Sequence, residues 1–160
     1  MQNRPKCVNF AIRFMNWFSM VETLKNNIFK KNIGGIKMKR AVMQVYVKDS
    51  INAVEFYRKA FDAPFMADHK NEDGTYYEHA ELDVYGQTLA LMESSEVNMV
   101  TGNSMQFFLH FGEGKEAVVQ KIYDVLKDGA EIKYPLSPND WSPLITDLVD
   151  KFGVRWLIAV

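Results

Sequence analysis

The stretch AVMQVYVKDSINAVEFYRKAF, residues 41–61, decides the fold. Its first part, residues 41–47, is rich in Val and Tyr, which is typical of a β-strand. Residues 51–61 then carry apolar side chains at helical spacing, and Ser50 stands where a helix N-cap is expected. The stretch therefore predicts a strand that leads directly into an amphipathic helix.

Three further strands are predicted after this helix, at residues 64–70, 76–85 and 87–93. Alternation of apolar and polar side chains and a high content of β-branched and aromatic residues favour strands here. The pairs Asp73-Gly74 and Tyr85-Gly86 supply the residues that tight turns need between them. The first half of the chain thus predicts the order strand, helix and three strands.

The same order recurs after the polar residues 94–103. A strand at 105–111 precedes a helix at 115–127, which ends at Gly129 as helices commonly do. Three more strands are predicted, at residues 131–134, 144–149 and 154–160. A βαβββ unit leaves one face of its sheet uncovered, so two units have to combine. We predict the class α+β, in which two βαβββ modules form an open, cup-shaped mixed sheet with the helices outside. The modules are expected at about residues 39–93 and 104–160, within a single domain at 38–160.

Composition narrows the classes of function. The chain has 160 residues, one cysteine and a formal net charge of −1. A single cysteine, Cys7, excludes an internal disulfide framework and a zinc site of CxxC type. The lack of a basic surplus argues against nucleic acid as a partner, and no apolar run is long enough to span a membrane. We expect a cytoplasmic protein.

The first 37 residues differ from the rest of the chain, because they hold seven Lys or Arg and one acidic residue. They fit a secretory signal poorly, since Arg13, Asn16 and Glu22 interrupt any apolar core. One interpretation is an amphipathic helix that docks on the body or on an anionic surface. Another is a translated leader, because residues 34–37 correspond to a bacterial ribosome-binding site and spacer. The natural start would then be Met38.

Two short segments resemble a known family. The first combines Val45-Tyr46-Val47-Lys48-Asp49 with residues 53–61, and the second is Leu148-Val149-Asp150-Lys151-Phe152-Gly153-Val154-Arg155-Trp156. They are similar to the opening "V-x-D…A-x-x-F-Y…F" of vicinal oxygen chelate proteins and to the ending "D-x-F-G-x-x-W" of their PhnB-like branch. This superfamily includes glyoxalases, bleomycin resistance proteins and dioxygenases. The resemblance covers about residues 39–160, supports the predicted fold, and implies a homodimer.

The resemblance also implies where a metal would lie. Metal enzymes of the superfamily place one ligand on the first and fourth strand of each half, and these positions align here with Val42, Ala90, Gln106 and Leu157. Three aliphatic side chains supply no oxygen or nitrogen donors, which divalent cations require. We therefore expect no metal site and no cofactor, although a divalent metal is conceivable if the ligands are shifted.

Side-chain alternation then selects the residues expected to face the cup. Gln44 and Tyr46 follow Val42 on one face of a strand, and Met92 follows Ala90. The remaining candidates for contact with a small-molecule ligand are Gln106, Phe108, His110 and the loop residue Trp141. A lining of Met and aromatic side chains with a few polar tips suits an apolar or planar molecule, although the same side chains also suit plain core filling.

Three functions remain open at this stage, and no catalytic residue is assigned, so whether the chain is an enzyme is undecided. The first is metal-independent binding of a small molecule, which is how bleomycin resistance members of the superfamily act. The second is a metal-dependent lyase, isomerase or dioxygenase with shifted ligands, for which His79, Glu81, Gln106 and His110 are the donors. The third is a non-catalytic interaction protein. Glu93 and Glu96 are interpreted as solvated rather than catalytic.

Overall fold

The computed structural model describes residues 38–100, 102 and 104–160. The hypotheses about residues 1–37 therefore lie outside the described residues. Residues Val42–Val160 form one compact unit. No helix among the described residues is long and apolar enough to cross a membrane.

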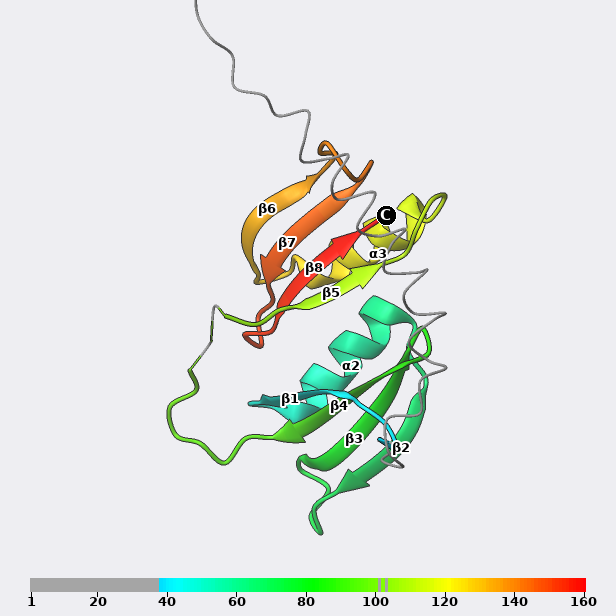
Figure 1. The fold of residues 1–160 in the computed structure, drawn as a ribbon. Helices are drawn as coiled ribbons and strands as arrows, with labels where there is room; N and C mark the ends of the chain where they lie inside the picture. Colours follow the sequence, from blue (N-terminus) through cyan, green and yellow to red (C-terminus); the bar gives the residue numbers. More distant parts are fainter. Residues whose placement is uncertain (1–37, 101, 103) are drawn as a thin grey trace, which may run out of the picture. The chain divides into compact units, whose positions relative to one another are not determined.

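The first module begins with the strand β1 (Met43–Val47) and the helix α2 (Ser50–Phe61). Three strands follow, namely β2 (Phe65–Lys70), β3 (Tyr77–Val84) and β4 (Gln87–Glu93). They form a four-stranded sheet, here the first sheet, in the order β1-β4-β3-β2. In it β1 and β4 are parallel, whereas the other neighbours are antiparallel (Figure 1).

The second module repeats this plan with β5 (Phe107–His110), α3 (Glu116–Leu126), β6 (Glu131–Ser137), β7 (Ile145–Val149) and β8 (Arg155–Ala159). Its strands form the second sheet, in the order β5-β8-β7-β6 with β5 and β8 parallel. The predicted class α+β with two βαβββ modules is confirmed. Hydrogen bonding divides the eight strands between two separate four-stranded sheets.

The core lies between the helices and the sheets. Tyr57 and Phe61 project from α2 to the buried Trp156 of β8, with ring centroids 5.9 and 5.2 Å apart. The helix also packs on β3 and β4 of its own sheet, so it lies between the two sheets (Figure 1). In β1 the buried Val45 and Val47 face this core. The opposite face of each sheet is called its outer face below.

A buried carboxylate joins the two modules. Asp150, in the turn between β7 and β8, accepts hydrogen bonds at Oδ2 from Tyr57 Oη (2.7 Å) and from Trp156 Nε1 (2.8 Å). Its Oδ1 accepts the backbone N–H groups of Phe152 (2.9 Å) and Val154 (3.1 Å). Four donors on one carboxylate satisfy an acid that would otherwise be costly to bury. Burial nevertheless raises the pKa of Asp150, because desolvation outweighs these hydrogen bonds.

The start of α2 corrects two predictions. The N-cap is Asp49, in the left-handed region with φ 62°, and not Ser50. Ser50 is the first helical residue, and its hydroxyl accepts the N–H of Tyr77 at 2.8 Å. Glu93, interpreted as solvated, accepts the N–H groups of Asp49 (3.0 Å) and Ser50 (2.7 Å). Two N–H groups at the start of the helix are thus satisfied by a carboxylate from the end of β4, where negative charge also complements the helix dipole.

Replacing Glu93 with Ala is expected to lower the free energy of unfolding by about 1.5 kcal/mol, because two helix N–H groups lose a charged acceptor. Urea unfolding followed by circular dichroism measures this change. Glu96→Ala is the matched control, since this side chain is exposed, and the change there is expected to stay within about 0.5 kcal/mol. Equal losses in the two variants would contradict the capping role of Glu93.

Candidate functional site

The outer face of the second sheet carries an exposed aromatic cluster. Phe108 and His110 lie on β5 with ring centroids 5.9 Å apart. The ring of Trp141, from the loop between β6 and β7, meets Phe108 edge-on at 6.2 Å and 87°. Phe108 is 43% exposed and Trp141 44%. Three of the predicted ligand-contacting residues therefore lie together, and their rings are open to solvent.

The loop that carries Trp141 is held in place by hydrogen bonds. Asn139 Oδ1 accepts the N–H groups of Trp141 (3.1 Å) and Ser142 (2.9 Å). The buried hydroxyl of Ser142 lies 2.9 Å from Leu144 O and 3.0 Å from Val160 O. These bonds tie the loop to the end of β8. The backbone that carries the indole is thus ordered before any ligand arrives, which lowers the entropic cost of binding.

Polar groups border the aromatic cluster. Gln106, just before β5, is exposed and shares the outer face with Phe108 by strand alternation. On β8, Arg155 makes a bidentate ion pair with Asp147, with Nε–Oδ1 at 3.0 Å and Nη2–Oδ2 at 2.7 Å. Leu157 pairs in register with both Phe108 and Asp147. The face thus combines aromatic and aliphatic area with an amide and a charge-balanced ion pair.

Arg155 and Asp147 were not among the residues predicted for this face. A signal for Arg155 was present, because it alternates with Leu157 on a predicted strand. The partnership with Asp147 depends on the register of β7 against β8, which pairs Val149 with Arg155 and Asp147 with Leu157. Register of this kind follows from the turn and from packing, and it cannot be read from alternation alone.

The other three predicted residues lie on the first sheet. Gln44 Nε2 donates a hydrogen bond of 2.9 Å to Tyr46 Oη, and Tyr46 pairs in register with Met92. On β3, His79 Nε2 lies 3.1 Å from Glu81 Oε1, so the prediction that these two share a face is confirmed. The seven predicted residues therefore form two sets, one on each sheet.

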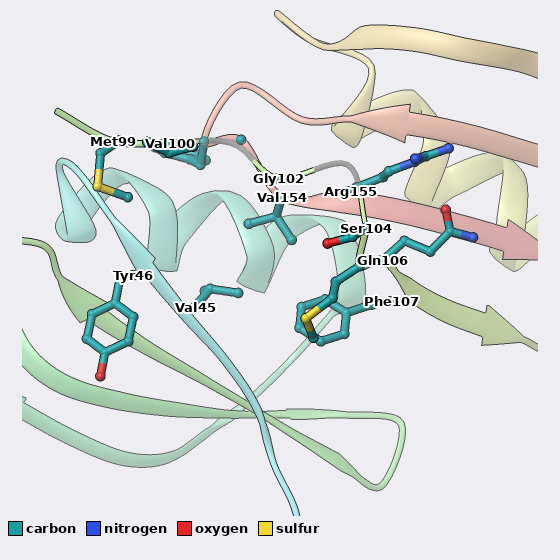
Figure 2. A pocket seen from close by; sticks show the side chains of 13 residues that line it. Val45, Tyr46, Met99, Val100, Gly102, Ser104, Gln106, Phe107, Val154 and Arg155 are labelled. Atoms are coloured by element: carbon teal, nitrogen blue, oxygen red, sulfur yellow. The ribbon is translucent and has the colours of Figure 1, made fainter.

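A cavity of about 300 Å³ contacts one predicted residue from each set, namely Tyr46 and Gln106 (Figure 2). Its walls come from β1, from the segment before β5, and from the turn between β7 and β8. The other residues that line it are Val45, Met99, Val100, Gly102, Ser104, Met105, Phe107, Phe152, Gly153, Val154 and Arg155. This cavity was not predicted from the sequence, because its walls are far apart in the chain.

The donor chemistry does not fit a resident metal. Within the part of the chain that the structure describes, no group of three or more His, Cys, Asp or Glu side chains is placed to hold an ion. Ala90 on β4 and Leu157 on β8, two of the aligned ligand positions, have no donor atoms. The donors considered for shifted ligands are divided, with His79 and Glu81 on the first sheet and His110 on the second.

Several solved structures share this fold. The PhnB protein from Bacillus cereus matches with a TM-score of 0.66 at 19% identity, over 76% of this chain and 98% of that one. TioX from Micromonospora sp. ML1 has a TM-score of 0.51 at 20% identity, over 74% and 97% of the two chains. A mutant of FosX from Listeria monocytogenes, in complex with Mn(II) and 1S,2S-dihydroxypropylphosphonic acid, has a TM-score of 0.58 at 14% identity, over 78% and 93%.

At these identities the structural likeness shows the fold alone. No curated protein matches the chain by sequence. The model of one family, described as the Glyoxalase/Bleomycin resistance protein/Dioxygenase superfamily, matches residues 39–158. This range covers both βαβββ modules except for the last residue of β8, and it contains both segments that carry the sequence resemblance. The chain therefore belongs to the Glyoxalase/Bleomycin resistance protein/Dioxygenase superfamily.

Proposed function

We propose that the chain binds an apolar or planar small molecule, without a metal, on the outer face of the second sheet. The observation that carries this proposal is the exposed cluster of Phe108, His110 and Trp141, in which the ring of Phe108 contacts the other two rings. Aromatic rings in such a cluster offer faces and edges on which a planar molecule stacks. The amide of Gln106 and the imidazole of His110 border this area and supply hydrogen bonds that orient a ligand.

The proposal includes a homodimer and a place in the PhnB-like branch. Within one chain, Gln44, Tyr46 and Met92 lie on a different sheet from the aromatic cluster. A second copy that sets its first sheet against this second sheet would bring all seven residues to one ligand. The exposed Tyr46 and Phe108 support this arrangement, because exposed apolar side chains mark contact surfaces. Sedimentation equilibrium of the full chain tests it, and a monomer would contradict it. A cytoplasmic location remains our proposal.

Binding is tested by a thermal-shift screen of planar aromatic compounds, followed by calorimetric titration of the compounds that stabilise the protein. Phe108→Ala and Trp141→Ala are each expected to raise the Kd of such a compound at least tenfold, because the stacking surface is lost. That factor corresponds to about 1.4 kcal/mol. Tyr76→Ala is the matched control, since this exposed tyrosine precedes β3 in the first module, and its Kd should stay within about twofold.

Two outcomes favour the other functions. Near-stoichiometric metal in the purified full chain, or a higher Tm on adding Mn²⁺, Zn²⁺, Ni²⁺ or Fe²⁺, would favour a metal-dependent enzyme that uses His79, Glu81, Gln106 and His110. We expect the Tm to stay unchanged, because Ala90 and Leu157, two of the aligned ligand positions, have no donor atoms. A screen in which no compound stabilises the protein would favour a non-catalytic interaction protein.

A further inference from the structure

We infer that the cavity bordered by β1, β5 and the turn between β7 and β8 is a second ligand site, which takes an uncharged molecule of one or two aromatic rings. Phe108, His110 and Trp141 are not among its lining residues, so this site differs from the one proposed on the outer face of the second sheet. Of the seven residues proposed to contact a ligand on the outer face, Tyr46 and Gln106 also line this cavity. The inference does not rest on the proposed function.

The lining determines the class of ligand. Most of the side chains are aliphatic, thioether or aromatic, and they include Val45, Met99, Phe107 and Val154. A site of this composition favours apolar area, and the flexible Met side chain adapts to the shape of the occupant. The hydroxyl of Ser104, which lines the cavity, points toward Val154 (Figure 2), and it gives the ligand one polar partner. An aromatic ring with a hydroxyl substituent meets both requirements.

The charges at the wall of the cavity argue against an anionic ligand. Arg155 is the one charged residue among the described residues that line the cavity, and its guanidinium is paired with Asp147 through two short hydrogen bonds. An anion would have to compete with a carboxylate that already has bidentate geometry. The charge at this wall is therefore balanced within the protein. An uncharged molecule gains the apolar burial without the cost of bringing in an unpaired charge.

The size of the cavity fits this class. An apolar cavity of about 150 Å³ in another protein holds one benzene molecule. The cavity here is about 300 Å³, which leaves room for a fused pair of rings. Its volume also lies at the lower end of the range for small-molecule sites in proteins.

One wall of the cavity is fixed from both modules. Phe152 and Val154 line it, and their N–H groups donate to Asp150 Oδ1. The other oxygen of Asp150 accepts the hydroxyl of Tyr57, which belongs to α2 in the first module. The backbone of Asp150 and Val154 is further joined by a hydrogen bond of 2.9 Å. This wall is thus organised before binding, so its ordering costs no free energy when a ligand enters.

The test uses 2-naphthol as the probe and the full chain, titrated by calorimetry. Val154→Trp fills the cavity and keeps the backbone hydrogen bonds of this residue. Ser104→Trp fills it from an exposed position, which protects the test against misfolding of the first variant. Each is expected to raise the Kd of 2-naphthol at least tenfold. 2-Naphthoate, the anion of similar size, is expected to bind wild-type protein at least tenfold more weakly than 2-naphthol.

Tyr76→Ala is the control, because this exposed residue belongs to neither site, and its expected Kd for 2-naphthol is within about twofold of wild type. The inference would be overturned by the absence of 2-naphthol binding to the wild-type chain, or by an unchanged Kd in both filling variants. In the second case, a Kd at least tenfold higher in Phe108→Ala would show where the probe binds. That result would place the probe on the outer face and support the proposed function instead. Failure of the two proposals is therefore distinguishable.

Discussion

Asp150→Ala is expected to lower the free energy of unfolding by about 4 kcal/mol, because four donors, two of them buried and two partly buried, lose their acceptor at once. The donors are Tyr57 Oη, Trp156 Nε1 and the N–H groups of Phe152 and Val154. Each buried donor without a partner costs about 1–3 kcal/mol, and the costs are not additive within one network. Urea unfolding monitored by circular dichroism gives the change.

Two further variants separate the parts of this network. Asp150→Asn keeps the shape and one acceptor oxygen, so we expect a loss of about 2 kcal/mol. Tyr57→Phe removes only the hydrogen bond that crosses from α2 to the second module, and we expect a loss of about 1 kcal/mol. A loss below about 1 kcal/mol in Asp150→Ala would show that the carboxylate is not a main link between the modules.

The raised pKa of Asp150 gives the same experiment a pH dependence. Burial disfavours the ionised carboxylate of Asp150 in the folded state, so its pKa is higher in the folded than in the unfolded chain. The pKa in the unfolded chain is about 3.8–3.9. At pH values between these two pKa values, the folded chain binds more protons than the unfolded chain. The contribution of Asp150 to stability is therefore largest below the unfolded pKa and falls as the pH rises through the folded one. The stability difference between wild type and Asp150→Asn should shrink over this interval.

Much of the fold follows from local patterns in the chain. Apolar side chains at helical spacing predict the helix at 51–61, and the structure places it at Ser50–Phe61. The turn at Tyr85-Gly86 is confirmed, with φ angles of 52° and 84° and with Val84 paired to Gln87. Two successive residues with positive φ in a two-residue loop match the twist of a hairpin. Such features are local, so the sequence is sufficient to predict them.

Features that join distant segments were not predictable in this way. Ser50 has the chemistry of an N-cap, yet the cap of α2 is supplied by Glu93, which is 43 residues later. The choice depends on β1 and β4 being parallel neighbours, since this pairing brings the end of β4 to the start of α2. The helix-capping propensity of one residue does not predict how two strands elsewhere in the sheet pair.

The candidate site shows the same division. Strand alternation correctly predicts that Phe108 and His110 share a face. The contact between Phe108 and Trp141 is a loop contact, and it depends on the hydrogen bonds that Asn139 and Ser142 make. This contact could therefore not be predicted from the sequence.

Trp156→Ala is expected to lower the free energy of unfolding by about 4 kcal/mol, because a large side chain with no exposed area leaves a cavity where the modules meet. The indole contacts Tyr57 and Phe61 of α2 and Phe107 of β5, with ring centroids 5.2–5.9 Å apart. Its Nε1–H also donates to Asp150. The variant thus loses packing between the modules together with one hydrogen bond of the carboxylate.

Urea unfolding again measures this loss, and two variants serve as controls. Trp156→Phe keeps an aromatic ring and removes the N–H donor, so we expect a loss of about 2 kcal/mol. Trp141→Ala removes an indole that is 44% exposed, and we expect a change within about 1 kcal/mol. Similar losses in Trp141→Ala and Trp156→Ala would contradict the interpretation that the contact of Trp156 with α2 holds the modules together. The contrast between the two residues separates stability from binding, because Trp141→Ala is expected to weaken the ligand while the fold is retained.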